Sequence, residues 1–168
     1  MSALPIIRPV SLKDAAAIAA IYNPYIRETV ITFEEELVSA GEIEKRIQNI
    51  LSFGYPYLVM ELEERVIAYA YAGQWRSRSA YRHTVETSIY LERDLIGKGF
   101  GSTLYQALLD EIRKLDIHIV LGGITLPNPA SVRLHEKLGF KKVAHFNEAG
   151  YKFGQWLDVG FWQLSLPV

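Results

Sequence analysis

The feature that most constrains the fold of this chain is a strand-like stretch that runs directly into a glycine-rich loop and then a helix. Between residues 84 and 91, apolar and polar side chains alternate with the period of two that is typical of a β-strand. Gly97, Gly99 and Gly101 follow, and glycine lets the backbone approach a ligand closely. Beyond them, leucine and isoleucine recur at helical spacing. Because the first turn of a helix has unpaired N–H groups and the positive end of the helix dipole, this stretch predicts a phosphate-binding site.

The spacing of these glycines leaves several interpretations open. A dinucleotide-binding fold requires G-x-G-x-x-G and an acidic residue at the end of the next strand, whereas here the pattern is G-x-G-x-G and Asp116 precedes that strand. A P-loop requires Ser or Thr after its lysine, but Lys98 is followed by Gly99. A helix entry that is rich in glycine for backbone reasons alone also fits the pattern.

Composition and charge narrow the class of protein. Of the 168 residues, 49% are hydrophobic and 22% are charged, and no linker divides the chain, so we expect one domain over residues 1–168. The net charge of −1 gives no general attraction to nucleic acid or to a membrane surface, and no apolar stretch approaches the roughly 20 residues of a membrane helix. Since the chain lacks cysteine and a signal peptide, we expect a cytoplasmic protein. Its histidines lack metal-ligand spacing with carboxylates, so no metal site is predicted.

The order of the other predicted elements indicates the fold class. Hairpin patterns come first and a strand–helix–strand pattern comes later, which predicts an α/β (α+β) domain with a mixed, mostly antiparallel sheet flanked by helices. The first helix should end or kink at Asn23-Pro24, and residues 147–154 should form a mobile segment between two closing strands. The predicted helices cover residues 12–21, 40–53 and 130–138, and the predicted strands cover residues 6–9, 57–62, 66–75, 117–124, 140–145 and 156–164.

The glycine loop and a later segment together resemble the GNAT N-acetyltransferase superfamily. The G-x-G-x-G between a strand and a long helix is similar to the acetyl-CoA site of that superfamily. Residues 128–140, in which an asparagine is followed by a helix ending in Lys-Leu-Gly-Phe, are similar to its second signature. The resemblance implies a single GNAT-like domain that binds acetyl-CoA. Ile96 stands where the superfamily usually has Arg or Gln. We therefore expect the rim of the acetyl-CoA site to differ, while the backbone N–H groups of the glycine loop still bind the pyrophosphate.

Five sequence blocks narrow the resemblance to the phosphinothricin acetyltransferase branch, which includes methionine sulfoximine acetyltransferases. That branch implies transfer of acetyl from acetyl-CoA to the α-amine of a small amino acid analogue, such as phosphinothricin, methionine sulfoximine or methionine sulfone, by a cytosolic homodimer. Two alternatives stay open: another acceptor amine, such as a protein N-terminus or a polyamine, and a non-catalytic acyl-CoA sensor. The blocks are residues 71–76, 81–86, 101–105, 131–136 and 158–163.

Acetyl transfer requires a base, because an amine attacks a thioester only when it is unprotonated. Glu86 lies on the strand beside the glycine loop, where desolvation would raise its pKa, although a glutamate on a sheet surface could equally be solvated. The branch uses a glutamate here as base. It also has a histidine at the position of His135, which implies proton donation to the thiolate that leaves.

The remaining predicted contacts are with acetyl-CoA and with the acceptor. Backbone N–H near Ile89 is the predicted oxyanion donor, and the strand end could pair with the pantetheine amides. Arg76 and Arg78 precede the strand of Glu86, and a guanidinium suits a carboxylate or phosphinate, although a solvated basic loop is the alternative. The predicted cofactor contacts are Ile89, Tyr90, Leu91, Gly97, Lys98, Gly99, Phe100, Gly101, Ser102, Asn128 and Ser131. The predicted substrate contacts are Phe33, Arg76, Arg78, Tyr81, Glu86, Thr87 and Ser88.

Overall fold

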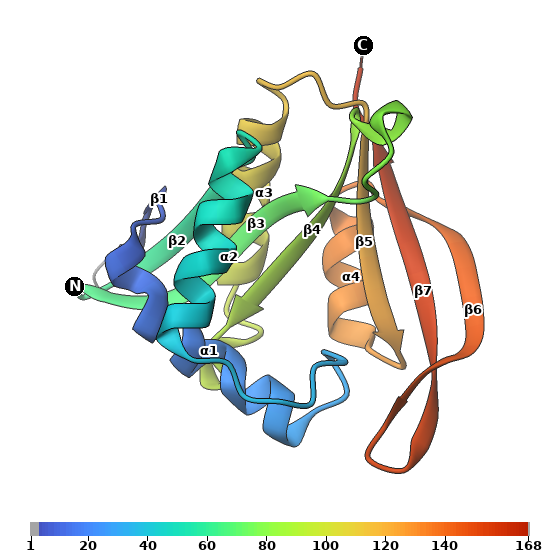
Figure 1. The fold of residues 1–168 in the computed structure, drawn as a ribbon, viewed down its shortest axis with the longest axis horizontal. Helices are drawn as coiled ribbons and strands as arrows, with labels where there is room; N and C mark the ends of the chain where they lie inside the picture. The colour runs from blue at the N-terminus through green and yellow to red at the C-terminus, as the bar shows by residue number, and fades with distance from the viewer. Residues whose placement is uncertain (1–3, 168) are drawn as a thin grey trace.

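Seven strands form one twisted sheet in the order β1-β2-β3-β4-β5-β7-β6 in the computed structural model, which describes residues 4–167 (Figure 1). Neighbouring strands are antiparallel except for β4 and β5, which are parallel, so the sheet is mixed and mostly antiparallel as predicted. The strands are β1 (Ile6–Pro9), β2 (Tyr57–Leu62), β3 (Arg65–Gln74), β4 (Thr84–Leu91), β5 (Ile119–Leu126), β6 (Lys141–Lys152) and β7 (Gln155–Ser165). The helices are α1 (Ala15–Glu28), α2 (Ala40–Ser52), α3 (Phe100–Ile112) and α4 (Pro129–Lys137).

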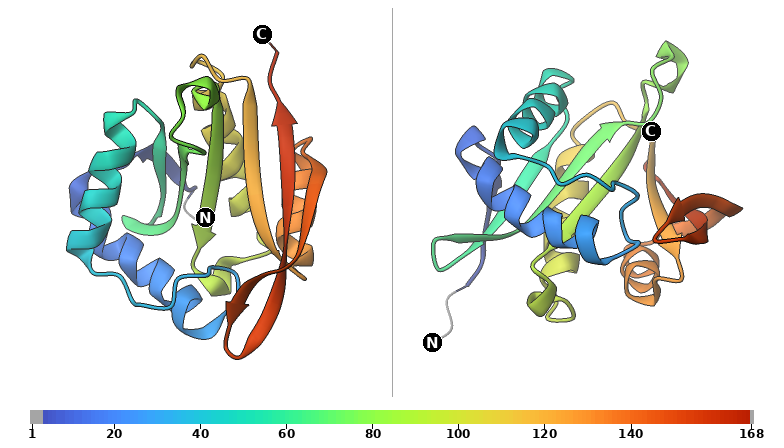
Figure 2. Two further views of the ribbon diagram at one scale, coloured as in Figure 1. Left: turned by 45° about the vertical axis from the view of Figure 1, so that its right-hand side comes forward. Right: turned by 60° about the horizontal axis from the view of Figure 1, so that its bottom comes forward.

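Helices cover both faces of the sheet, with α1 and α2 on one face and α3 and α4 on the other (Figure 2). Successive side chains of β3 point to opposite faces of the sheet, so the two faces carry different side chains. Ala68, Ala70 and Ala72 point toward α3, and their small side chains let that helix pack closely on the strand. Tyr69 points the other way and joins the core beneath α1 and α2. Burial on both faces gives the strands the rigidity that a site built on them requires.

The parallel strands β4 and β5 pair over only a short stretch and then separate. Their pairing runs from Thr84 opposite Ile119 to Glu86 opposite Leu121. Beyond that point, β4 continues beside β3 and β5 continues beside β7, so the two strands diverge (Figure 1). We call the opening between residues 87–91 of β4 and residues 122–126 of β5 the wedge. Each side of the wedge presents strand backbone that pairs with no strand across the opening.

Helix α1 is longer than predicted, because it continues through Pro24 to Glu28. Proline inside a helix removes one hydrogen bond and crowds the preceding turn, at a cost of about 3 kcal/mol. The next turn buries Tyr25 and Ile26 against the sheet, and burial of such side chains stabilises by roughly 1.5–3 kcal/mol each. The tertiary contacts therefore offset the local penalty, and the prediction that the helix ends or kinks at Asn23-Pro24 was wrong about its end.

Residues 147–154, predicted to be a mobile segment, instead extend β6 and turn into β7. Contacts with the segment between α1 and α2 hold this hairpin in place. Lys152, 1% exposed, donates from Nζ to the Thr32 carbonyl at 2.8 Å. The Phe33 ring lies against Gly150, where a Cβ would come within 2.2 Å of it. A single short stretch of sequence cannot reveal such contacts, because the partners lie far apart along the chain.

Candidate active site

A cavity of about 330 Å³ lies where the end of β4, the glycine loop and the start of α4 meet. Among the predicted cofactor contacts, nine line it: Ile89, Tyr90, Leu91, Gly97, Gly99, Gly101, Ser102, Asn128 and Ser131. These residues come from three separate elements, and the fold brings them together at the open side of the wedge. The cavity is also lined by residues that the sequence did not single out, which are Tyr25, Ile31, Ala130, Arg133, Leu134 and Lys137, and by Ile96.

The glycine loop has the backbone geometry of an anion site. Gly97 and Gly99 have φ of 85° and 88°, in the left-handed region that favours glycine, and Gly99 is the N-cap of α3. Thr103 donates its N–H to the Gly99 carbonyl at 3.2 Å, which is the first bond of the helix ladder. The N–H groups of residues 100–102 therefore have no acceptor within the helix and point out of its end. This arrangement fits the pyrophosphate of acetyl-CoA.

Two predicted cofactor residues do not belong to the lining of the cavity. Lys98 is exposed and is not part of the cavity lining, and Phe100 packs against the core beneath α3. Periodicity cannot distinguish a loop residue whose side chain faces solvent from one whose side chain faces the cavity.

Helix α4 adds polar groups to the opposite wall of the cavity. Asn128 accepts the Ser131 N–H at its Oδ1 at 3.2 Å and so caps the helix, which leaves its amide NH₂ as the group that can reach a ligand. Arg133 and Lys137 are four residues apart, so they lie on one helical face, and both line the cavity. No carboxylate lies within ion-pair distance of either cation in the described part of the chain. The signal that could have identified them is their spacing after Asn128.

Glu86 lies at the closed end of the wedge, on the face of the sheet opposite α3. Its Oε1 would be 3.2 Å from a Cβ at Gly123, so the carboxylate extends across bare backbone of β5, and the Phe161 ring lies at the same distance from that point. Burial raises the pKa of Glu86 above its ordinary value. No ion-pair partner of this carboxylate lies within residues 4–167. A half-buried carboxylate with a raised pKa is suited to act as a general base.

Ser88 and Thr87 lie on opposite faces of β4. Ser88 shares the face of Glu86, in keeping with the period of two. Thr87 is buried on the other face, where its hydroxyl contacts Tyr105 at 2.5 Å. Its position does not support the prediction that its side chain contacts the substrate.

His135 is buried behind the wall of the cavity and is not part of its lining. It is 4% exposed, and burial lowers its pKa below the ordinary value. Its Nδ1 lies 2.8 Å from the carbonyl oxygen of Ser131, and Ser131 is the residue that separates it from the cavity. A protonated imidazole is therefore disfavoured at this position, which constrains its predicted role as a proton donor.

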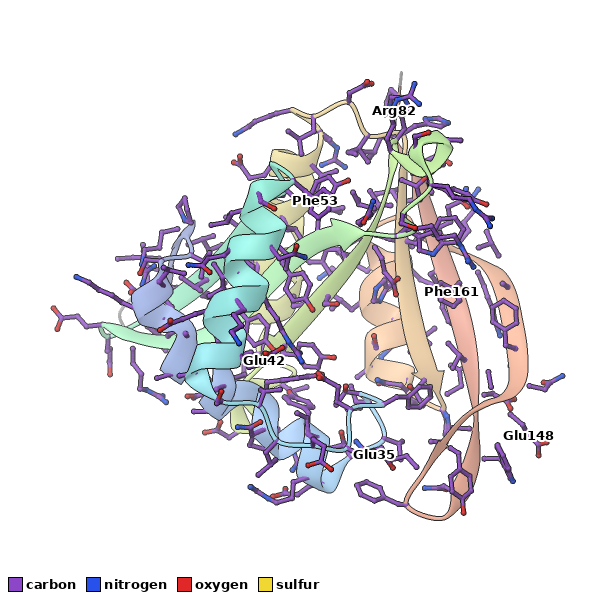
Figure 3. The ribbon with its side chains drawn as sticks, viewed as in Figure 1. Glu35, Glu42, Phe53, Arg82, Glu148 and Phe161 are labelled. Atoms are coloured by element: carbon purple, nitrogen blue, oxygen red, sulfur yellow. The ribbon has the colours of Figure 1, made fainter. Side chains whose placement is uncertain are left out.

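The predicted acceptor contacts do not form one group. Arg76 lies with its guanidinium 4.7 Å above the Trp75 ring, which meets Tyr81 edge-on at 5.0 Å, and Arg78 is exposed in the same loop. That loop leads into β4 at the closed end of the wedge, where Figure 3 labels Arg82. Phe33 belongs instead to the segment between α1 and α2, whose Glu35 lies at the other end of the molecule in the same view (Figure 3).

Two kinds of feature are absent from the described residues. Residues 4–167 contain no group of three or more His, Cys, Asp or Glu side chains that could hold a metal ion. In the same residues, no helix is both long and apolar enough to cross a membrane.

Known proteins resemble this chain over almost its full length. The chain is 42% identical over 153 residues to an L-amino acid N-acyltransferase, MnaT, of Escherichia coli (strain K12), covering 91% of this chain and 89% of that protein. It is 40% identical over 153 residues to an L-methionine sulfoximine/L-methionine sulfone acetyltransferase of Salmonella typhimurium, covering 91% and 90%. The structure of a GNAT superfamily phosphinothricin acetyltransferase from Sinorhizobium meliloti, solved with acetyl-CoA, superposes with a TM-score of 0.93 at 37% identity, covering 99% of this chain and 89% of that one.

These relatives confirm the predicted fold, enzyme class and cofactor. Residues 7–160 match the family model described as the acetyltransferase (GNAT) domain. The chain therefore belongs to the GNAT acetyltransferase family.

Proposed function

We propose that this chain transfers the acetyl group of acetyl-CoA to the α-amine of a small amino acid analogue of the phosphinothricin, methionine sulfoximine or methionine sulfone type. The observation that carries the proposal is the position of Glu86, a half-buried carboxylate that has no charged partner among the described residues, at the closed end of the wedge. The names of the relatives support the acceptor class. A cytosolic location is part of the same proposal.

In this proposal, Glu86 takes the proton of the acceptor amine. A carboxylate whose pKa is raised by burial is a stronger base than an exposed one. Acetyl-CoA supplies the acyl group as a reactive thioester. The N–H groups at the start of α3 bind its pyrophosphate, the backbone of residues 89–91 pairs with its amides, and backbone N–H near Ile89 stabilises the oxyanion. His135 remains our proposal for the proton that the leaving sulfur takes up.

Two cations of α4 supply positive charge at the cavity. Ile96, which stands where the superfamily usually has Arg or Gln, supplies none. Arg133 and Lys137 line the cavity, and we infer that they bind phosphate groups of the cofactor. Replacing both with alanine should weaken CoA binding by about 10²-fold or more, because each charge-assisted hydrogen bond contributes roughly 1.5–3 kcal/mol. Titration calorimetry with CoA and with dephospho-CoA measures the effect. Lys141→Ala, an exposed lysine just beyond α4, is the control, and an unchanged affinity in the double variant would exclude the two cations from the site.

A homodimer is also part of the proposal. The hairpin of β6 and β7 exposes a run of aromatic side chains: Phe146 (52%), Tyr151 (55%), Phe153 (57%) and Trp156 (64%). Such contiguous apolar surface is unusual on a monomer and typical of an interface. A second copy of this chain would cover it, and light scattering of the wild type and of Trp156→Glu tests this. A monomeric wild type would contradict the dimer without affecting the proposed reaction.

The direct test of the function is a steady-state assay of acetyl-CoA consumption against a panel of acceptors. The panel contains methionine sulfoximine, methionine sulfone, phosphinothricin, ordinary amino acids, a polyamine and a peptide with a free N-terminus. We expect the highest kcat/KM for the sulfoximine, the sulfone or phosphinothricin. A preference for the polyamine or the peptide would replace the proposed acceptor, and the absence of turnover with any amine would favour an acyl-CoA sensor.

The arginines before β4 should govern acceptor binding. If Arg76 and Arg78 bind the anionic groups of the acceptor, each alanine substitution should raise the acceptor KM, because such contacts are similar in the ground and transition states. Loss of one charge-assisted hydrogen bond, roughly 1.5–3 kcal/mol, corresponds to a fall of about 10- to 100-fold in kcat/KM. Initial rates with methionine sulfoximine and with the matching decarboxylated amine measure this.

The neighbouring Arg82 supplies a matched control for that experiment. Arg82 is exposed in the same loop and donates to the Ser79 carbonyl at 3.3 Å, so Arg82→Ala should leave the acceptor KM unchanged. Parameters for acetyl-CoA should stay nearly constant in all three variants. If the wild type prefers the decarboxylated amine, or if both variants acetylate the amino acid as well as the wild type does, these arginines are only a solvated loop.

A further inference from the structure

Three buried polar side chains form a continuous hydrogen-bond chain on the face of the sheet opposite Glu86. Thr87 Oγ1 lies 2.5 Å from the Tyr105 hydroxyl, and that hydroxyl lies 3.2 Å from Nε2 of His135. The residues come from β4, α3 and α4, and they are 7%, 0% and 4% exposed. Buried polar groups in mutual contact hold one another in a fixed arrangement, since an unpaired member would be costly.

The second nitrogen of His135 determines the direction of this chain. Nδ1 lies 2.8 Å from the Ser131 carbonyl, and a carbonyl oxygen can only accept a hydrogen bond. In the neutral imidazole, Nδ1 therefore carries the hydrogen and Nε2 has the lone pair. Tyr105 must then donate to Nε2, and Thr87 must donate to Tyr105. Burial, reinforced by the nearby charge of Glu86, raises the pKa of Tyr105, so its hydroxyl keeps the hydrogen that this direction requires.

The same atoms satisfy the reverse direction when the imidazole gains a proton. Both nitrogens of a charged His135 donate, so Tyr105 must accept from Nε2 and donate to Thr87. The hydrogen of Thr87 then needs another acceptor, and the Leu121 carbonyl lies 3.3 Å from its Oγ1. The charge of His135 and the orientation of the two hydroxyls are therefore coupled.

The hydrogen-bond chain of Thr87, Tyr105 and His135 reaches the closed end of the wedge. Thr87 follows the last residue of β4 that pairs with β5, and Gly122 is its counterpart on β5. A Cβ at Gly122 would lie 2.4 Å from Nε2, so the imidazole packs directly against the backbone of β5. A proton that leaves Nε2 meets the Tyr105 hydroxyl first. Glu86 and the chain thus lie at the same end of the wedge, on opposite faces of the sheet.

We propose that Tyr105 is a positioning residue of the acetyl transfer, acting through His135 and itself oriented by Thr87. Its hydroxyl donates to Nε2 of the neutral ring and accepts from Nε2 of the charged ring, so it fixes the orientation of the imidazole in both charge states. The inference rests on the proposed function, because Tyr105 has no part in the reaction unless His135 has one.

The first test measures His135 in the unliganded protein and needs no turnover. The groups that face its imidazole are Tyr105 of α3, Ser131 of α4, Gly122 of β5 and the Phe140 ring, and none carries a charge at neutral pH. Tyr105→Phe removes one hydroxyl and keeps the ring that meets His135 edge-on at 5.2 Å. Tyr105 can bond Nε2 in both charge states, but the bond from the charged ring is charge-assisted and stronger, so its loss should lower the pKa of His135. Nitrogen-15 NMR of the imidazole measures this pKa, and the signal is assigned by its loss in His135→Gln. A titration of His135 that is unchanged in Tyr105→Phe would overturn the inference.

The second test separates positioning from packing by kinetics. Tyr105→Phe should lower kcat by about tenfold, as expected for one lost hydrogen bond of roughly 1.4 kcal/mol, with little change in the KM of acetyl-CoA. The pH profile of kcat should shift with the pKa of His135. Thr87→Val should lower kcat and shift its pH profile in the same direction but by less. Thr87→Ser keeps the hydroxyl and should have wild-type values of both. Tyr57→Phe, at a buried tyrosine stacked on Tyr71 beneath α2, is the matched control and should leave kcat unchanged.

His135→Gln distinguishes failure of this inference from failure of the proposed function. Full turnover in His135→Gln would remove His135 from the reaction, and with it the positioning role. If His135→Gln loses turnover while Tyr105→Phe keeps the wild-type kcat and pH profile, His135 acts without Tyr105, and the inference alone is overturned.

Discussion

Replacing Glu86 with glutamine should lower kcat at pH 7 by about 10²-fold or more, the usual scale for loss of a general base. Glutamine keeps the shape and the position across Gly123 but cannot take the proton of the amine. The affinity for acetyl-CoA should change little, because the predicted cofactor contacts lie on the glycine loop, β4 and α4. Stopped-flow or steady-state rates together with calorimetry separate the two effects. Near-normal turnover at pH 7 would remove Glu86 from the mechanism.

The pH dependence gives a second readout of the same variant. Burial raises the pKa of Glu86, so the rate should fall with decreasing pH through that raised pKa, at a higher pH than for an exposed glutamate, and this limb should vanish in Glu86→Gln. A raised carboxyl pKa also means that the folded state binds the proton more tightly than the unfolded state, so stability falls as pH rises through this range. Glu86→Gln should therefore not lower the Tm at pH 7. Glu92→Gln, directly after β4 and paired with Arg65, is the control and should retain full turnover.

Replacing Gly99 with valine should weaken acetyl-CoA binding by about 10²-fold or more. The φ of Gly99 is 88°, a region that costs a β-branched residue more than glycine, so the loop must shift. Such a shift moves the N–H groups at the start of α3 away from the phosphate, and loss of two charge-assisted hydrogen bonds of roughly 1.5–3 kcal/mol each accounts for the magnitude. Titration calorimetry with acetyl-CoA measures the change.

Gly54→Val is a matched control for the loop variant. Gly54 has φ of 76° at the end of α2, away from the cavity, and like Gly99 it has no heavy atom of the described residues within 4 Å of an added Cβ. Both variants carry similar backbone strain, so circular dichroism should show similar losses of stability. Only Gly99→Val should lose affinity. Unchanged binding in a folded Gly99→Val protein would mean that the cofactor binds elsewhere.

The sequence by itself determined the parts of this protein that depend on neighbouring residues. The alternation from residue 84 to residue 91, the glycines that follow and the helical spacing beyond them are each read within about one element, because strand and helix periods are local properties of the backbone. The order of these elements, with the segment of residues 128–140, was enough for the family and for nine of the cavity residues. The position of Glu86 on the strand followed from the same pattern.

The tertiary structure alone decided the features that join distant residues. The separation of β4 from β5 depends on pairing with β3 and β7, and the fixed hairpin of β6 and β7 depends on Lys152 reaching Thr32, 120 residues away. The hydrogen-bond chain from Thr87 through Tyr105 to His135 spans steps of 18 and 30 residues, and it buries the side chain of Thr87, a predicted substrate contact. Contacts of this kind leave no periodic trace in the sequence, because their free energy comes from burial and hydrogen bonding that exist only once the sheet and its two helical layers have assembled.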